Sequence, residues 1–143
     1  MKKLQNYLHD NKLDCALFLN GEKPDPNSFY LTGYVGSGVL IVPASGRAIL
    51  HVPDRDKTEA MSIKGVLVSV ADKNRKLSDA LKEYGISTSK IGICFNNIFV
   101  SDFNSLKERL NCSFTDLSNF MQEIRMIKNS SEIARIQKAC SIT

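Results

Sequence analysis

Histidine and acidic side chains are the residues of this sequence best suited to act as acids, bases or metal ligands. The 143-residue chain contains two histidines, His9 and His51. A metal centre needs three or four ligands, and neither histidine is followed by another histidine or a cysteine at helical spacing. Asp54 and Asp56 could form a carboxylate pair, but they stand at an expected helix start, where capping and the helix dipole account for them. None of these four residues therefore predicts a catalytic centre.

The segment Val35-Gly-Ser-Gly38 places a serine between two glycines. In a nucleophile elbow such a serine joins a strand to a helix, whereas this segment precedes an expected strand. A phosphate-binding loop would end in Gly-Lys-Ser or Gly-Lys-Thr and would open a helix, and this segment does neither. The spacing therefore predicts neither a nucleophile nor a phosphate site here.

The composition excludes several classes of protein. Hydrophobic residues make up 43% of the chain, and the net charge is +4. Lys and Arg are spread along the chain without interleaved aromatic residues, which gives nucleic-acid binding little support. No apolar run approaches the roughly 20 residues that span a membrane, and no signal segment follows Met1. The cysteines are widely spaced and are expected to be buried thiols in the reducing cytoplasm: Cys15, Cys94, Cys112 and Cys140.

Hydrophobic periodicity divides the chain into alternating strands and helices. Short apolar runs predict strands at 15–19, 38–43, 47–53, 65–70, 90–95 and 113–116. Amphipathic stretches predict helices at 2–12, at 54–61 with Asp54 as N-cap, and at 73–84, 99–110 and 118–127, with a single helical turn within 27–34. The second and third strands are joined by a short turn and must pair antiparallel. This order predicts an α/β fold with a mixed sheet of about six strands and helices on its faces.

The last stretch of the sequence begins a helix. Asn129 followed by Glu132 forms a capping box, which predicts a helix from near Ser130. Its apolar positions form a narrow stripe: Ile133, Ile136, Ala139 or Cys140, and Thr143. No glycine, proline or basic last turn ends this helix. Two interpretations stay open, namely a chain cut inside a helix of a longer protein and a frayed C-terminal helix of a complete small domain.

Two motifs resemble signatures of one peptidase family. Arg125-Met-Ile-Lys-Asn-Ser-Ser-Glu-Ile133, with Ile136 and Ala139, resembles the hinge Arg-x-Ile/Val-Lys-Ser/Asn-x-x-Glu-Ile/Leu-x-x-Ile/Leu-x-x-Ala of the creatinase, prolidase and aminopeptidase P family. Asn27-Ser-Phe-Tyr-Leu-Thr-Gly-Tyr34 resembles the family's Asn-x-x-Tyr-Leu-Thr-Gly-Phe/Tyr. The resemblance implies that residues 1–127 form the family's N-terminal domain, a three-layer α/β/α unit of ribonuclease H-like type. Residues 128–143 would then be the hinge and first helix leading to a catalytic "pita-bread" domain absent from this chain.

The resemblance also implies an activity for the parent protein. That protein would be a homodimeric Xaa-Pro dipeptidase (prolidase), or the related aminopeptidase, which hydrolyses the peptide bond before proline in peptide substrates. The family holds two divalent metal ions (Mn, Co or Zn) with two Asp, one His and two Glu of the catalytic domain. This chain alone is therefore expected to carry no cofactor and no catalytic residue, and to be inert.

The implied roles of this domain are dimerisation and shaping of the active-site entrance. In family dimers, a loop of the domain leans toward the catalytic pocket of the neighbouring subunit. By position that loop is Tyr34, Val35, Gly36 and Ser37. The alternative that Gly33 and Gly36 merely let the chain turn into the next strand stays open.

Two other functions also stay open. One is a non-enzymatic peptide- or protein-binding module that keeps the same shape. The other is a small nucleotide- or flavin-binding α/β protein, which the lack of a glycine-rich strand-to-helix turn disfavours.

Overall fold

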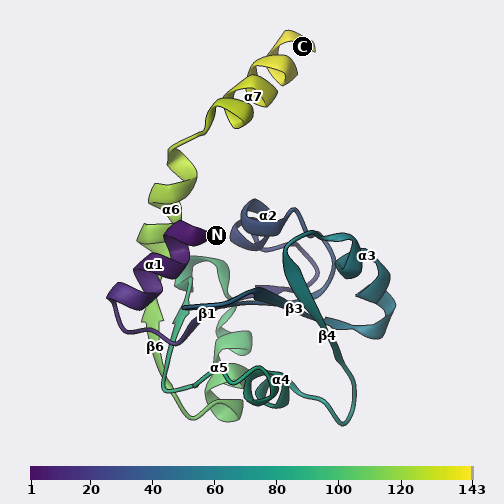
Figure 1. Ribbon diagram of the computed structural model, residues 1–143, viewed down its shortest axis with the longest axis vertical. Coiled ribbons are helices and arrows are strands. Elements are labelled where there is room, and N and C mark those ends of the chain that lie inside the picture. The colour runs from purple at the N-terminus through teal and green to yellow at the C-terminus, as the bar shows by residue number, and fades with distance from the viewer. Residues whose placement is uncertain (143) are drawn as a thin grey trace.

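A six-stranded mixed sheet with helices on both faces forms the body of the protein (Figure 1). The computed structural model describes residues 1–142. The elements in chain order are α1 (Lys2–Asp10), β1 (Cys15–Asn20), α2 (Pro26–Thr32), β2 (Gly38–Pro43), β3 (Ala48–Pro53), η1 (Asp54–Asp56), α3 (Lys57–Ser62), β4 (Val66–Ala71), α4 (Leu77–Glu83), β5 (Lys90–Ile93), η2 (Phe95–Asn97), α5 (Val100–Arg109), β6 (Ser113–Asp116), α6 (Ser118–Met126) and α7 (Ser130–Ile142). The predicted α/β class and mixed sheet are confirmed.

The strand order in the sheet is β4-β3-β2-β1-β5-β6. β2 runs antiparallel to both of its neighbours, and the other adjacent pairs are parallel. The predicted hairpin is present, with Val39 opposite His51 and Ile41 opposite Ile49. The five remaining strands all point the same way. We call the edge where they end the carboxyl edge of the sheet, and the opposite edge the amino edge.

Side chains alternate between the two faces of the sheet and build a core on each face. On β1, Ala16 and Phe18 join the core under α1, α3 and α6, whereas Cys15 and Leu17 join the core over α4 and α5. Figure 1 shows these two sets of helices on opposite sides of the strands. Because β1 is covered on both faces, its sequence is an unbroken apolar run. Burying a side chain such as Phe18 stabilises the fold by roughly 1.5–3 kcal/mol.

Residues 26–32 form the seven-residue helix α2, where the sequence pattern predicts only a single turn. The Asp25 carboxylate accepts hydrogen bonds from the amides of Asn27 and Ser28, at 2.8 and 3.0 Å. Pro26 occupies the first helical position, where its missing N–H has no intrahelical acceptor to lose. Gly33, with φ of 76°, ends the helix in the left-handed conformation. The Asp-Pro pair is the sequence signal for this longer helix.

Asp54 is not the N-cap that the sequence pattern predicts. Residues 54–56 form a 3-10 turn, and α3 begins only after them, without a side-chain cap. The carboxylate of Asp56 instead accepts a hydrogen bond from the amide of Ser37 at 3.2 Å. This acidic segment therefore holds a neighbouring loop rather than a helix end.

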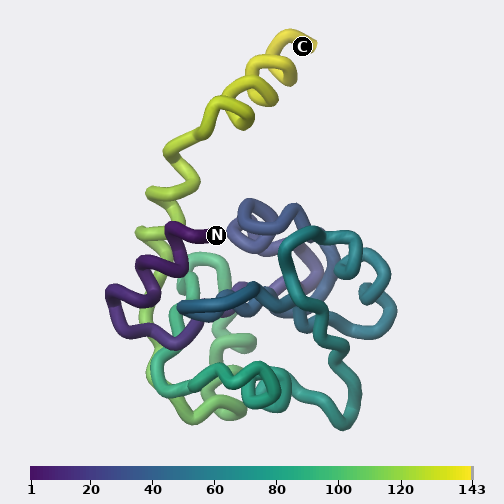
Figure 2. The backbone as a smooth tube through the Cα atoms, in the orientation of Figure 1, coloured from purple at the N-terminus to yellow at the C-terminus, as the bar shows by residue number. Residues whose placement is uncertain are grey.

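α7 extends away from the body of the protein (Figure 2), and none of its described residues is buried. Cys140 is consequently exposed, so the prediction that all four cysteines are buried is wrong for this residue. Cys15 and Cys94 are buried as predicted, and Cys112 is half-buried. The last position of the predicted apolar stripe, Thr143, lies outside the described residues. None of the helices within residues 1–142 is both long enough and apolar enough to cross a membrane.

Candidate functional site

A buried polar network at the carboxyl edge fixes α2 to the end of β1. Asn20 donates from Nδ2 to Ser28 Oγ at 3.0 Å and accepts from the Asp25 amide at 2.8 Å. All three residues are buried. Burial raises the pKa of the Asp25 carboxyl, while the amides of Ser28 and Asn27 and the charge of Arg125 act against that rise. Because such buried groups are stable only when satisfied, the network holds α2 in one orientation.

The two segments that carry the family resemblance touch each other. Arg125, near the end of α6, donates from Nη1 to Asn27 Oδ1 at 3.1 Å. The hydroxyl of Tyr30 donates to the carbonyl of Ile124 at 3.2 Å. The sequence pattern identifies both segments but gives no sign of this contact, because its partners are 98 positions apart. The exit of the chain toward α7 is therefore attached to α2.

The loop predicted to shape an active-site entrance is folded around the ring of Tyr34. This side chain is fully buried, and its hydroxyl donates to the carbonyl of Ser37 at 2.8 Å. Burial, followed by the charges of Asp56 and Glu59, raises the pKa of Tyr34 to about 12. Gly36 packs against the ring, since a Cβ there would lie 2.6 Å from the Tyr34 Cζ atom. Tyr34 and Gly36 therefore shape the loop from within.

Val35 is the member of this loop that projects into solvent. Its side chain is 52% exposed, whereas Gly36 and Ser37 are half-buried. A partner that approaches the loop would therefore meet Val35 before the other three residues.

The segment after α6 forms the capping box that the sequence predicts. Glu132 donates its amide to Asn129 Oδ1 at 2.9 Å, and the Asn129 amide donates to Glu132 Oε2, also at 2.9 Å. These bonds satisfy two amides that a helix start leaves without intrahelical acceptors. The start of α7 is therefore defined locally, without help from the sheet.

Several large apolar side chains between the end of α6 and the middle of α7 are exposed. Met126 ends α6 and Ile127 follows it, and the exposed apolar residues of α7 include Ile133 and Ile136. Met126 and Ile127 are 75% and 69% exposed, and Ile133 and Ile136 are 45% and 49% exposed. This stretch is therefore suited to pack against another protein surface.

The two histidines lie apart and in different settings. His9 is exposed on α1, with Nδ1 3.5 Å from Asp10. His51 is buried on β3, with Nδ1 2.9 Å from Ser69 Oγ, and burial followed by the charge of Arg75 lowers its pKa. Across residues 1–142, no three side chains of His, Cys, Asp or Glu are grouped so that they could hold a metal ion.

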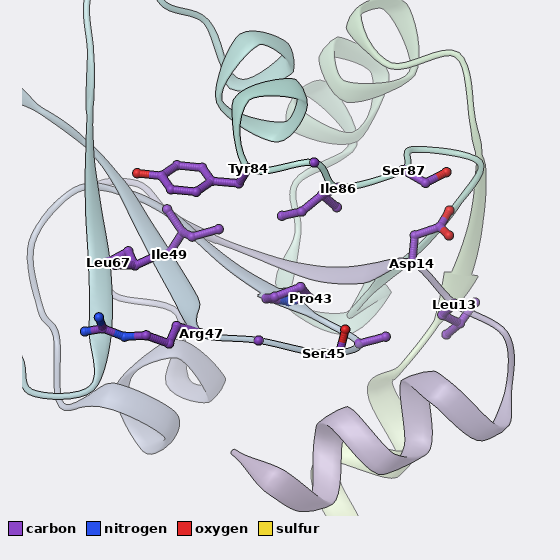
Figure 3. A pocket seen from close by; sticks show the side chains of 13 residues that line it. Leu13, Asp14, Pro43, Ser45, Arg47, Ile49, Leu67, Tyr84, Ile86 and Ser87 are labelled. Atoms are coloured by element: carbon purple, nitrogen blue, oxygen red, sulfur yellow. The ribbon is translucent and has the colours of Figure 1, made fainter.

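A pocket of about 370 Å³ lies at the amino edge, between the β2–β3 turn and the segment that follows α4 (Figure 3). Asp14 and Arg47 lie at its opposite ends. The Asp14 carboxylate accepts from the amides of Ser89 and Lys90, at 2.9 and 2.8 Å, and Arg47 donates to the Val66 carbonyl at 3.2 Å. Both charged side chains thus bind the surrounding backbone. Their presence in the pocket is accounted for by these contacts, without a ligand.

Comparison with known proteins gives a consistent set of relatives. Residues 1–127 match the family model described as Creatinase/Prolidase N-terminal domain. The Xaa-Pro dipeptidase of Pyrococcus horikoshii is 27% identical over 99% of this chain and 38% of that protein. An uncharacterized peptidase of Staphylococcus saprophyticus is also 27% identical, over 81% of this chain and 34% of that protein.

Solved structures share the fold. The prolidase of Pyrococcus horikoshii superposes with a TM-score of 0.78 at 25% identity, over 99% of this chain and 39% of that one. A proline dipeptidase structure from Streptococcus pneumoniae superposes with a TM-score of 0.73 at 24% identity, over 89% of this chain and 97% of that one. The fold thus forms part of a longer chain in the prolidase of Pyrococcus horikoshii. It makes up almost all of the structure from Streptococcus pneumoniae. The present chain spans 34–39% of the length of the curated relatives it matches.

Proposed function

The chain belongs to the creatinase/prolidase N-terminal domain family, and we propose that it serves as the N-terminal domain of a prolidase-like Xaa-Pro dipeptidase. The parent protein hydrolyses the peptide bond that precedes proline. The observation that carries this proposal is the similarity to the Xaa-Pro dipeptidase of Pyrococcus horikoshii across 99% of the chain. That match extends past residues 1–127 into residues 128–143, the segment to which we assign the role of hinge and first helix.

We assign the exposed apolar residues of the hinge and α7 to contact with a catalytic domain. α7 has 13 residues and buries none of them in the described structure. Isolated helices of about this length are marginal in water and gain most of their stability from packing an apolar face. Ile133 and Ile136, one turn apart, provide such a face.

The proposed hydrolysis uses two divalent metal ions (Mn, Co or Zn) held by the catalytic domain. Such ions polarise the scissile carbonyl and supply a hydroxide near neutral pH, and they require several carboxylate and imidazole ligands. Residues 1–142 do not bring together such a set of ligands. We therefore assign no step of the hydrolysis to this chain.

The proposed contribution of the domain is to shape the active-site entrance of the neighbouring subunit in a homodimer. The exposure of Val35 supports a contact by that side chain. Tyr34 supports the loop from inside, through its hydrogen bond to Ser37. The Ser37 amide in turn bonds to Asp56, which holds the loop against η1.

The complete protein tests this proposal when it is assayed with Ala-Pro and Ala-Ala. We expect Ala-Pro to be hydrolysed at least about tenfold faster. EDTA should abolish the activity, and added Mn²⁺ should restore it. Failure to hydrolyse Ala-Pro with Mn²⁺ present would contradict the proposal. If Ala-Pro were bound but not cleaved, the non-enzymatic peptide-binding module would be the better description.

A further inference from the structure

A second cleft lies at the carboxyl edge, on the face of the sheet covered by α4 and α5. Its volume is about 420 Å³, within the roughly 300–1,000 Å³ typical of small-molecule sites. Its floor is a row of neighbouring strand residues, in which Leu19 pairs with Val39 and Val39 pairs with His51. In open α/β sheets, the carboxyl ends of parallel strands are the usual place for ligands.

His51 lines this cleft, and its hydrogen bond to Ser69 indicates which ring nitrogen carries the proton. The hydroxyl of Ser69 is buried, and its one hydrogen-bond partner among the described residues is His51 Nδ1. A buried hydroxyl that donates to nothing carries a desolvation penalty, so Ser69 donates and Nδ1 accepts. The lowered pKa of His51 favours the neutral ring, and in the neutral ring that accepts at Nδ1 the proton lies on Nε2. Nε2 has no acceptor within residues 1–142.

Arg75 lines the same cleft and supplies a second donor without an acceptor. Its guanidinium pairs with Glu83 through one terminal nitrogen. Its Nε is buried and has no hydrogen-bond partner in the described chain. Such a buried, unsatisfied donor is uncommon in native proteins. The other charged residues that line the cleft are Lys76 and Arg109, both basic, and Asp72 and Asp102, both acidic.

We propose that this cleft binds the carboxylate of a small organic acid. Two donors of its lining residues, His51 Nε2 and Arg75 Nε, have no acceptor within residues 1–142, so the complementary ligand is one that supplies acceptors. A carboxylate supplies two acceptor oxygens and gains from charge-assisted bonds to Arg75. Leu19 and Val39 in the floor offer apolar surface to the rest of the ligand. The amino-edge pocket lacks this property, because its two charged side chains are engaged by the backbone.

The carboxylate can belong to a free acid or to the C-terminus of a peptide, and the probes distinguish these sources. 4-Methylpentanoate represents the free acid, N-acetyl-leucine represents a peptide C-terminus, and 4-methylpentanamide is the neutral control. Each is titrated into the ¹⁵N-labelled 143-residue chain, and amide shifts around His51 and Arg109 are followed by NMR. We expect saturable shifts at the cleft with a carboxylate and at least about tenfold weaker binding of the amide. The tighter of the two acids identifies the source.

Variants localise the binding. Arg75→Gln should weaken carboxylate binding at least about tenfold, whereas Arg55→Gln, at an exposed position on η1 that does not line the cleft, should change it less than about twofold. If Arg75→Gln does not fold, Arg109→Gln takes its place and should also weaken binding. Equal binding of acid and amide, unchanged binding in the folded cleft variant, or no saturation by either acid would overturn the proposal.

The tautomer of His51 gives an independent test that requires no ligand. Long-range ¹H–¹⁵N spectra should place the ring proton on Nε2. A proton on Nδ1 would remove the second donor and would overturn the proposal for a carboxylate.

Discussion

The guanidinium of Arg125 donates a 3.1 Å hydrogen bond to the side-chain oxygen of Asn27, joining α6 to α2 across 98 positions of the sequence. Tyr30 adds a second bond from α2 to the carbonyl of Ile124. α2 is itself fixed to the end of β1 by Asn20. The direction in which the chain leaves the domain is therefore set by contacts that reach back to the first strand.

Replacing Asn27 with Ala should destabilise the domain. Asn27 is buried, and its loss leaves the Arg125 guanidinium without this acceptor. Hydrogen bonds to charged groups contribute about 1.5–3 kcal/mol, and we expect the free energy of unfolding in urea to fall by that amount. Asn6→Ala, at an exposed position on α1, is the control and should change stability by less than about 0.5 kcal/mol. Equal effects of the two substitutions would show that the contact with Arg125 is not stabilising.

Asp25→Asn should alter how stability depends on pH. The raised pKa of Asp25 means that the folded protein keeps this proton at pH values where the unfolded chain has lost it. The free energy of unfolding contributed by this group therefore falls as pH rises from the unfolded value, about 3.9, through the folded pKa. Asn retains the capping oxygen but does not titrate. The stability of Asp25→Asn relative to the native chain should rise with pH across this window in urea unfolding, and a constant difference would contradict the prediction.

Gly36→Ala should disrupt the loop around Tyr34. The added Cβ would lie 2.6 Å from the ring carbon Cζ, so the fully buried ring would have to shift to accommodate it. Overpacking of this kind costs about 1–3 kcal/mol of unfolding free energy. Gly21→Ala is the matched control, because its Cβ would meet nothing within 4 Å. Thermal unfolding of the two variants measures the difference, and equal melting temperatures would contradict the packing seen here.

Val35→Asp should change substrate affinity in the complete protein if the loop shapes an active-site entrance. We expect the KM for Ala-Pro to change at least about threefold, with kcat less affected, because Val35 would contact substrate or its path without reaching the reacting bond. Met61→Asp, at an exposed apolar position on α3, should leave both constants unchanged. Unchanged kinetics in Val35→Asp would exclude the entrance role for this loop and favour a plain turn into β2.

Local patterns were sufficient to predict most of the sheet and the start of α7. The apolar run of β1, the short turn before Arg47 and the Asn129–Glu132 pair each act through neighbours within a few residues. The length of α2 was also encoded locally, in Asp25-Pro26, but a search for apolar periodicity does not detect a cap. A single sequence therefore predicts those helices, strands and turns that are determined by residues close together in the chain.

The contacts that shape the candidate sites could not be predicted in the same way. Ser37 and Asp56, or Asn27 and Arg125, meet only because the fold brings distant segments together. The burial of Tyr34 likewise depends on its packing into the core under α1 and α3. The sequence predicts the loops and helices in which these residues lie, but it does not show which distant residues they contact in the folded protein.

The most direct test compares the 143-residue chain with the complete protein in one assay, using Ala-Pro as substrate and Mn²⁺ as metal. We predict that the complete protein hydrolyses the dipeptide and that the 143-residue chain, folded under the same conditions, does not. Hydrolysis by the 143-residue chain alone, or none by the complete protein, would contradict the assignment of this chain as the non-catalytic N-terminal domain of an Xaa-Pro dipeptidase.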